Sequence, residues 1–518
     1  MGGNAVKTIV LLMVLVVLSF IVGAQVSDNV KDSIGAFAII GAVVGGGLLI
    51  YLGPRVWQLL FILPPFVELL PLPRVGHAIM QCGIAPYFVS TIILLYWIVL
   101  WSIGRARIRW RWAAILDVPF IIFVGFMVVA YIRFPVALNV MGLDYDAVGG
   151  EEIVVLFFLL THYICLSMIP ITKPELEKVL SLAFKLFIVA SILFFARSIV
   201  MRGQPVSDDG DGGGSHVTRF YALYPLGSTL FFWMYSKYPV LKIITSVRCW
   251  AISLFGAAAS LLTGQRQNMA LMAMGIVFIA CIKREVIVLI LALAGAYIGI
   301  LYLGELDLLT RLPNNAQRAL SSVPGAKIDE KMIRSGAGTM ETRNQVWTYA
   351  MNPHTGVIKD YLWGDGFALS RAFIERKSVA KMRGTGGGTN DMESMTVTRN
   401  FHNGAIHTIS RIGYVGLAWC TLMCIIAWAV SIQVLRVWYR TDTYPYIVIG
   451  IINMPIILLT YGYATYTTKN FLYSLQSYFF LKLCYCIARE NGLLRSLFMP
   501  QRYVPMMIRD AEKVSAAA

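Results

Sequence analysis

Long apolar runs separated by short polar segments make up most of this chain. They recur from residue 7 to residue 304 and again from 412 to 487, each about 16–22 residues long. A bilayer core takes about 20 helical residues per crossing, so each run has the length of a transmembrane helix. Barrel strands would alternate apolar and polar residues, and these runs do not. The pattern therefore predicts an all-α, polytopic membrane protein.

The runs predict spans near 7–24, 34–53, 56–72, 85–103, 115–132, 152–170, 179–199, 218–236, 244–263, 268–282, 286–304, 412–434, 445–462 and 470–487. Prolines interrupt 56–72, and 218–236 is a poor run, so we expect about 12–14 membrane crossings. The chain then divides into four parts. Residues 1–304 carry the first eleven spans, 305–411 form one large polar loop, 412–487 carry the last three spans, and 488–518 form an amphipathic tail.

Lysine and arginine are distributed unevenly between alternate connections. Twenty of them, including those in the run 105–111 and in the tail, fall on one side, and eight fall on the other. The positive-inside rule makes the first side cytoplasmic, which places both termini in the cytoplasm and the 305–411 loop on the outer face. Topology can supply much of the net charge of +16, which therefore requires no nucleic-acid partner. The tail is expected to lie on the anionic inner leaflet.

The polar loop is the unusual part of a chain in which 58% of residues are hydrophobic. Loops longer than about 12–15 residues are usually functional or disordered. This one contains ETRNQVWTYAMN, YLWGDGF, a Gly-rich insert, and RNFHNGAIHTISRIGYVGL leading into the next span. Its aromatics, paired glycines, histidines and arginines favour a functional loop.

The first candidate functional residue is Arg266, at the outer end of an apolar run in LLTGQRQNMA. An arginine within a membrane segment is expensive unless it faces a cavity or a partner, so it is a candidate for ligand binding. The alternative is that its side chain reaches the headgroups, with no further role.

The second candidate is Arg343 with Trp347, which share a face if ETRNQVWTYAMN is helical. Thr342 could cap that helix. Guanidinium donors pair with phosphate oxygens, so Arg343 could bind an anionic substrate. The alternative is a solvated cation beside an interfacial aromatic residue. In YLWGDGF, Gly364 and Gly366 indicate a structural turn.

The third candidate is His402, which is followed by Asn403, His407 and Arg411 before the span at 412. A histidine titrates near neutral pH and could act as a general base, although a lone histidine is more often a packing residue. His402 and His407 are five residues apart without a carboxylate motif, and we therefore expect no metal site.

Taken together, these elements resemble the O-antigen ligase and Wzy-type polysaccharide polymerase superfamily. The resemblance covers the region of Arg266 and residues 341–417. It implies a multi-pass protein of the bacterial inner membrane that transfers a glycan, without metal or other cofactor, from undecaprenyl diphosphate on the periplasmic face. The acceptor would be a glycan or a lipid-linked acceptor. The partners would be the bilayer and, in some systems, other polysaccharide-assembly proteins.

The resemblance also implies residue roles. Arg266 and Arg343 would hold the donor diphosphate, and His402 would activate the acceptor hydroxyl. The residues expected to support substrate binding or to match the family pattern are Trp347, Asn403, Arg411, Gly364, Gly366 and Gly413. Two positions depart from the family: Gln265 replaces the usual serine, and Arg411 occupies the place of an acidic residue.

Two other functions remain open from the sequence. A transporter or flippase of a lipid-linked glycan would need charged residues deep in several spans, where the sequence shows Lys185 and Lys482, and internal symmetry, of which we see none. A non-catalytic subunit of an envelope polysaccharide assembly complex could use the polar loop as a docking surface. The sequence does not distinguish a ligase from a polymerase.

Overall fold

The computed structural model describes residues 46–47, 49–63, 85–135, 150–200, 205–206, 217–218, 223–262, 266–321, 323–367, 401, 403–439, 441–460 and 468–494. Its elements are η1 (Gly53–Gln58), α3 (Leu59–Ile62), α6 (Ala85–Ser102), α7 (Ala114–Arg133), α8 (Gly150–Met168), α9 (Lys173–Val200), β1 (Pro205–Val206), β2 (Val217–Thr218), α10 (Leu223–Lys237), α11 (Val240–Thr245), α12 (Val247–Leu262), α13 (Arg266–Lys283), α14 (Val286–Glu305), α15 (Asn314–Leu320), α16 (Glu330–Met351), η3 (Pro353–Thr355), α19 (Gly404–Trp438), α20 (Tyr444–Ile451), α21 (Asn453–Thr460) and α22 (Thr468–Glu490). Apart from the two-residue strands β1 and β2, which pair antiparallel, these elements are helical. The protein is an all-α membrane protein, as the sequence predicts.

Three helices of the described residues, α7, α14 and α19, are long and apolar enough to cross a bilayer. Shorter apolar stretches lie at Leu49–Ile62, Val89–Ser102, Glu152–Met168, Val247–Leu262, Met269–Lys283 and Tyr444–Ile457. Every predicted span from 85–103 onward coincides with a helix, except that 445–462 is divided between α20 and α21. The predicted span 7–24, most of 34–53 and most of the tail lie outside the described residues.

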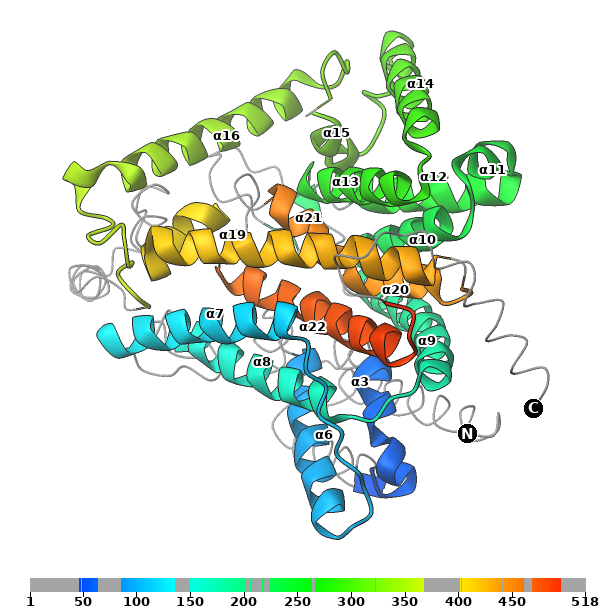
Figure 1. Ribbon diagram of the computed structural model, residues 1–518. Coiled ribbons are helices and arrows are strands. Elements are labelled where there is room, and N and C mark those ends of the chain that lie inside the picture. The colour runs from blue at the N-terminus through cyan, green and yellow to red at the C-terminus, as the bar shows by residue number, and fades with distance from the viewer. Residues whose placement is uncertain are drawn as a thin grey trace, which may run out of the picture.

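Helices α19 and α22 form the centre of the bundle (Figure 1). The two helices pack against each other. In addition, α19 packs against α7, and α22 packs against α8. Large aromatic side chains also join α7 to α22. Phe120 and Phe479 meet edge to face at 4.8 Å, and the hydroxyl of Tyr478 donates to the carbonyl of Leu116 at 2.6 Å. Burial of such large rings contributes much of the packing energy of a core.

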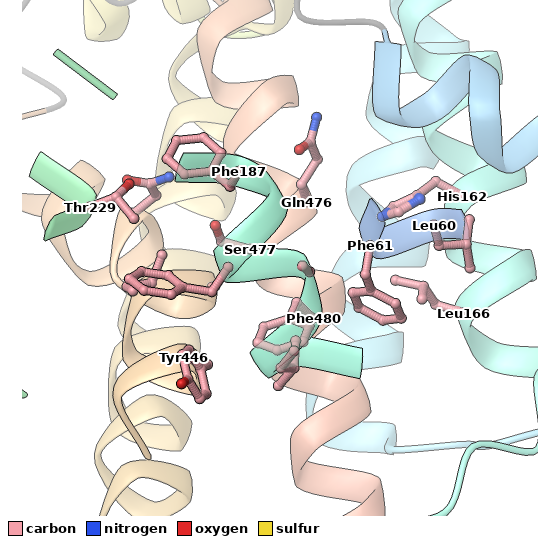
Figure 2. A pocket seen from close by; sticks show the side chains of 16 residues that line it. Leu60, Phe61, His162, Leu166, Phe187, Thr229, Tyr446, Gln476, Ser477 and Phe480 are labelled. Atoms are coloured by element: carbon pink, nitrogen blue, oxygen red, sulfur yellow. The ribbon is translucent and has the colours of Figure 1, made fainter. Parts of the chain in front are cut away.

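A cavity of about 340 Å³ lies between α3, α8, α9, α10, α20, α21 and α22 (Figure 2). Aromatic side chains such as Phe61, Phe184 and Phe480 contribute to its wall, together with a few uncharged polar side chains. By contrast, α14 lies at the edge of the bundle and is almost entirely exposed (Figure 1). Its apolar surface is what a lipid-facing helix presents.

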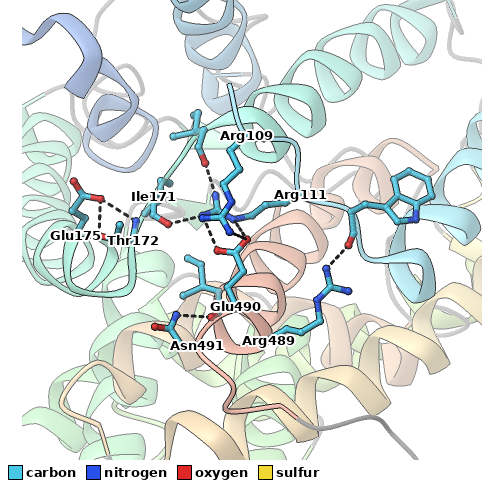
Figure 3. Close-up of polar contacts among 11 residues, drawn as sticks. Arg109, Arg111, Ile171, Thr172, Glu175, Arg489, Glu490 and Asn491 are labelled. Carbon is cyan, nitrogen blue, oxygen red and sulfur yellow. Dashed lines mark hydrogen bonds and ion pairs between the residues drawn. The ribbon is translucent and has the colours of Figure 1, made fainter. Parts of the chain in front are cut away.

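One end of the bundle, which we call the tail end, joins the α6–α7 connection to the end of α22 (Figure 3). The buried side chain of Arg111 pairs with Glu490 at 3.0 Å and donates to the carbonyls of Ile169 and Ile171. Arg489 donates to the carbonyl of Trp112 at 2.8 Å. The arginine-rich connection and the end of α22 therefore lie at the same end of the bundle.

A fully buried ion pair lies just inside the tail end. The ammonium of Lys482 lies 2.6 Å from Asp117 Oδ1 and donates to Ser167 Oγ at 2.7 Å. The hydroxyl of Tyr163 donates to the same carboxylate oxygen at 2.9 Å, and the backbone N–H of Ala113 donates to Asp117 Oδ2 at 2.5 Å. Both charged groups thus have several partners, as buried charges require.

The opposite end, which we call the loop end, is where α7 ends at Arg133 and α8 begins at Gly150. Residues 352–367 and the start of α19 lie there, and the C-terminal half of α16 packs against α19 (Figure 1). The described residues of the predicted polar loop are therefore partly helical, in α15 and α16.

Candidate functional site

The loop-end site is built around the start of α19. Asn403 caps this helix, because its side-chain oxygen accepts from the backbone N–H groups of Ala405 and Ile406 at 3.0 and 3.2 Å. The helix begins at Gly404, eight residues before the predicted span, and Ile406 to Gly413 are all buried. Residues 404–411, GAIHTISR, thus form a short helical segment inside the protein rather than the end of a loop.

Gly413 separates this segment from the rest of α19. Its backbone has φ 72° and ψ −177°, which breaks the helix. A broken helix frees backbone polar groups that only protein neighbours can satisfy in an apolar environment. The YLWGDGF turn provides these neighbours, since Tyr414 donates to Tyr361 at 2.8 Å, and Asp365 donates to Ser410 at 2.8 Å, in each case from backbone N–H to carbonyl.

The glycines of the two motifs are required by this contact. A Cβ atom on Gly413 would lie 2.0 Å from the carbonyl oxygen of Leu362, and one on Gly364 would lie 2.4 Å from the carbonyl carbon of Arg411. Both glycines also have positive φ angles, which favour glycine over other residues. The prediction that Gly364 and Gly366 form a structural turn is confirmed.

Two aspartates stabilise the turn itself. The carboxylate of Asp365 accepts from the backbone N–H groups of Lys359 and Asp360. Asp360 accepts from the N–H of Trp363 at 2.9 Å and pairs with Arg133, at the end of α7, at 2.9 Å. The hydrogen bond from Trp363, together with Arg133, lowers the pKa of Asp360 below its usual value.

Arg411 is buried beneath this turn, with only 2% of its side chain exposed. It donates to the carbonyls of Phe367 at 2.9 Å and Gly366 at 3.3 Å. Its second terminal nitrogen lies 3.6 Å from the carboxylate of Glu152, on α8. In this conformation the guanidinium group faces protein atoms, so that the structure supports a positioning role for Arg411 more directly than contact with substrate.

Glu152, at the start of the predicted span 152–170, is not among the candidate residues of the sequence. It is buried, and the same carboxylate oxygen that faces Arg411 lies 3.9 Å from His407 Nε2. A carboxylate from α8 thus lies beside Arg411. No sequence signal could identify this pairing, because it depends on the packing of α8 against the start of α19.

Helix α16 joins the site through Trp347. The indole N–H donates to the carbonyl of Phe401 at 2.7 Å, and Phe401 packs in a cluster with Val346 and Ile406. Arg343 is half-buried one helical turn before Trp347. The R-x-x-x-W motif is therefore hydrogen-bonded to Phe401, the residue directly before the H-N motif.

The structure brings together Trp347, Asn403 and Arg411 at the loop end, with Arg343 on the same helix as Trp347. His402 lies outside the described residues, although its neighbours Phe401 and Asn403 are described and buried. Arg266 is the first residue of α13, which packs against α10, α14, α15 and α21, and its side chain is not among those described. The roles of His402 and Arg266 therefore stay predictions.

Among the described residues, no three His, Cys, Asp or Glu side chains come close enough together to hold a metal ion. No protein-family model matches the chain, and no curated protein matches it. The likeness to the ligase and polymerase superfamily therefore depends on the motif residues alone.

Proposed function

We propose that the protein is a membrane glycosyltransferase that moves a glycan from a polyprenyl diphosphate to an acceptor at the loop end. The observation that carries this proposal is the 2.7 Å hydrogen bond from Trp347 to the carbonyl of Phe401. This bond joins the helix that carries Arg343 to Phe401, the residue before His402. The phosphate-binding candidate and the base candidate therefore belong to two segments that are in direct contact.

The position of the loop end relative to the membrane also supports the proposal. The exposed apolar side chains of Phe134, Leu362, Trp363 and Tyr414 gather there, as in the aromatic belt at a membrane interface. Helix α7 has 20 residues, which span about 30 Å, the thickness of a bilayer core. A site at its end lies where a lipid diphosphate meets water.

The proposed chemistry divides between two side chains. Arg343 binds the diphosphate and stabilises the negative charge that develops as the glycosidic bond to phosphate breaks. His402 accepts the proton of the acceptor hydroxyl, whose oxygen forms the new bond to the sugar. Asn403, Trp347 and Arg411 position the segment that carries His402, and Arg266 supplies a second phosphate contact.

The loop end faces the periplasm in this proposal, and both termini lie in the cytoplasm of a bacterial cell. The tail-end contact between Arg111 and Glu490 supports one part of it, because the basic connection and the end of α22 share one end of the bundle. Either a ligase or a polymerase would use the same site, with different acceptors.

The test supplies purified protein in nanodiscs with an undecaprenyl-diphosphate-linked glycan and acceptor, followed by mass analysis of the product. Arg343→Ala is expected to lower turnover about 10²–10³-fold, and His402→Ala about 10²–10⁴-fold. Arg334→Ala is the matched control, because Arg334 lies on the same helix, exposed and paired with Glu330. Wild-type-like product from both test variants would reject the proposal. One added glycan indicates a ligase, and a ladder indicates a polymerase.

The buried pair of Lys482 and Asp117 bears on the transporter alternative, because charged residues within a membrane often mark ion pathways. Here the ammonium lies against Asp117, Ser167 and the ring of Tyr163. Neither charged residue lines the cavity of Figure 2. The pair is therefore better explained as a connection between helices, and we favour the transferase.

A further inference from the structure

The cavity of Figure 2 is separate from the loop-end site. On α8 it is lined by His162 and Leu166, whereas Glu152 belongs to the loop end. Ten helical residues rise about 15 Å, so the cavity lies about half a bilayer core away from Glu152. A ligand in the cavity is therefore distinct from a group bound beside Arg343.

Most of the cavity wall is apolar. Phe61, Leu180 and Phe480 line it from α3, α9 and α22, and Ala183, Phe184 and Phe187 on α9 are half-buried. One water occupies about 30 Å³ of liquid, so a volume of about 340 Å³ accommodates on the order of ten heavy atoms. That is enough for part of a hydrocarbon chain and too little for a glycan with its diphosphate.

Besides His162, Tyr446 and Gln476, three further polar side chains, Thr229, Asn453 and Ser477, line the cavity. None of the three makes a hydrogen bond with another described residue. Ser477 is buried, Thr229 is half-buried, and Asn453 is exposed on the side of α21 that borders the cavity. Thr229 and Ser477 lie near the middle of α10 and α22, and Asn453 begins α21 in the middle of the α20–α21 pair. Polar groups at such depth are costly without partners, so the cavity offers hydrogen bonds to an occupant.

Among the described residues that line the cavity there is no Lys, Arg, Asp or Glu. Its histidine, His162, is buried and hydrogen-bonded to Ser90 at 2.5 Å. These lining residues therefore offer no charge to pair with a phosphate or a carboxylate. Burying such an anion without a counter-charge would be costly. A phospholipid would also keep its headgroup at the membrane surface, far from the polar side chains.

We propose that this cavity binds an uncharged lipid whose hydroxyl or carbonyl group lies near the middle of the bilayer. The polar group of the lipid exchanges hydrogen bonds with Thr229, Asn453 and Ser477, while its hydrocarbon chain packs against Phe61, Phe184 and Phe480. This inference does not depend on the proposed glycosyl transfer, since the cavity shares no residue with that site.

The test loads the purified full-length protein, in nanodiscs, with dioleoylglycerol, a short polyprenol, a lipid quinone or phosphatidylglycerol, and measures retained lipid by native mass spectrometry. Ala183→Trp fills the cavity, and Ile192→Trp, an exposed position of the same helix, is the control. We expect at least one uncharged lipid to be retained by the wild type and by Ile192→Trp and to be lost from Ala183→Trp.

A second variant keeps the shape of the cavity. Thr229→Val removes one hydroxyl and is expected to weaken retention about fivefold, the effect of one hydrogen bond. Retention of no uncharged lipid by the wild type, or equal retention by Ala183→Trp, would overturn the proposal. So would retention of phosphatidylglycerol alone with loss in Ala183→Trp. Thr229→Val also keeps the test valid if Ala183→Trp does not fold.

Discussion

Two buried ion pairs lie at opposite ends of the bundle, and α8 contributes to both. At the tail end Lys482 and Asp117 approach to 2.6 Å, and Tyr163 of α8 donates to the same carboxylate. At the loop end Arg411 lies 3.6 Å from Glu152 of α8. The first pair is a direct, charge-assisted hydrogen bond, whereas the second is an ion pair at longer range.

The backbones around the two pairs also differ. Asp117 lies in the first turn of α7, two residues before Pro119, and Lys482 lies within α22; both helices continue past these residues. Arg411, by contrast, lies two residues before the break at Gly413 and donates to the carbonyls of Gly366 and Phe367. Irregular backbone within a membrane is tolerated where it is buried in protein or lines a cavity, and it often marks functional sites. We infer that the tail-end pair stabilises the bundle, and that the loop-end pair positions a site.

The largest effect is expected from Lys482→Met. Removal of the cation leaves Asp117 as a buried carboxylate without its counter-charge, and breaking such a pair costs about 3–5 kcal/mol. Thermal unfolding of the purified protein in detergent should show a large drop in midpoint. Lys185→Met is the control, because Lys185 is exposed on α9.

Two further variants test whether the Lys482–Asp117 pair contributes more to stability than the Arg411–Glu152 pair does. Adding Asp117→Asn to Lys482→Met removes the unpaired charge and should recover much of the lost stability. Glu152→Gln should cost less than Lys482→Met, about 1–3 kcal/mol, because the 3.6 Å approach of Glu152 to Arg411 is longer than the 2.6 Å contact of Lys482 with Asp117. An equal loss in Glu152→Gln and Lys482→Met would remove the distinction between the two ends.

The next largest effect is expected from Gly413→Ala. The new Cβ would lie 2.0 Å from the carbonyl oxygen of Leu362, and the positive φ angle adds strain of about 1–3 kcal/mol. The YLWGDGF turn should separate from α19, which faster hydrogen exchange of the amides of Asp365 and Tyr414 would report. Gly299→Ala is the matched control, since α14 leaves open space around Gly299. Unchanged exchange in Gly413→Ala would show that the turn does not depend on this contact.

The positions of the helices were largely predictable from the sequence, because lipid requires long apolar runs wherever a helix crosses. The start of α19 was not. Hydropathy counts His407, Ser410 and Arg411 as a loop, whereas packing buries them inside a capped helix. The apolar pattern therefore predicted the start of this helix at 412 rather than at 404.

The site was predictable only in part, for a similar reason. The prediction that Thr342 caps its helix is wrong, because α16 begins at Glu330 and is capped by Asp329. The i, i+4 spacing of Arg343 and Trp347 predicted a shared face, but not that Trp347 would bind the carbonyl of Phe401. Contacts between distant segments, such as Glu152 with Arg411, follow from packing and leave no local pattern.

A smaller effect is expected from Trp347→Phe. The ring is kept, but the N–H donor to the carbonyl of Phe401 is lost, which costs about 0.5–1.5 kcal/mol. If this bond positions the loop-end site, glycan transfer should fall several-fold more than thermal stability alone explains. Trp363→Phe, at an exposed tip of the same end, is the control. Equal transfer by the two variants would show that the bond is only structural.

The smallest effect concerns Asp360 and the dependence of stability on pH. Hydrogen bonding from Trp363 and the charge of Arg133 lower the pKa of Asp360 in the folded protein. Because the folded pKa lies below the unfolded value, the ionised carboxylate contributes stability at neutral pH, and this contribution disappears as the pH falls through the folded pKa. The pair is solvent-exposed, so the contribution should be below about 1 kcal/mol.

Asp360→Asn should therefore lower the unfolding midpoint slightly at pH 7, and the difference from wild type should vanish in acid. High salt should reduce the part of the difference that comes from Arg133, since it screens exposed charges, while the hydrogen bond from Trp363 is largely unaffected. Arg133→Gln separates the two, because it removes the ion pair alone. If the difference between Asp360→Asn and wild type grew as the pH fell, the lowered pKa of Asp360 would be contradicted, and with it the view that the turn is held to α7 by this carboxylate.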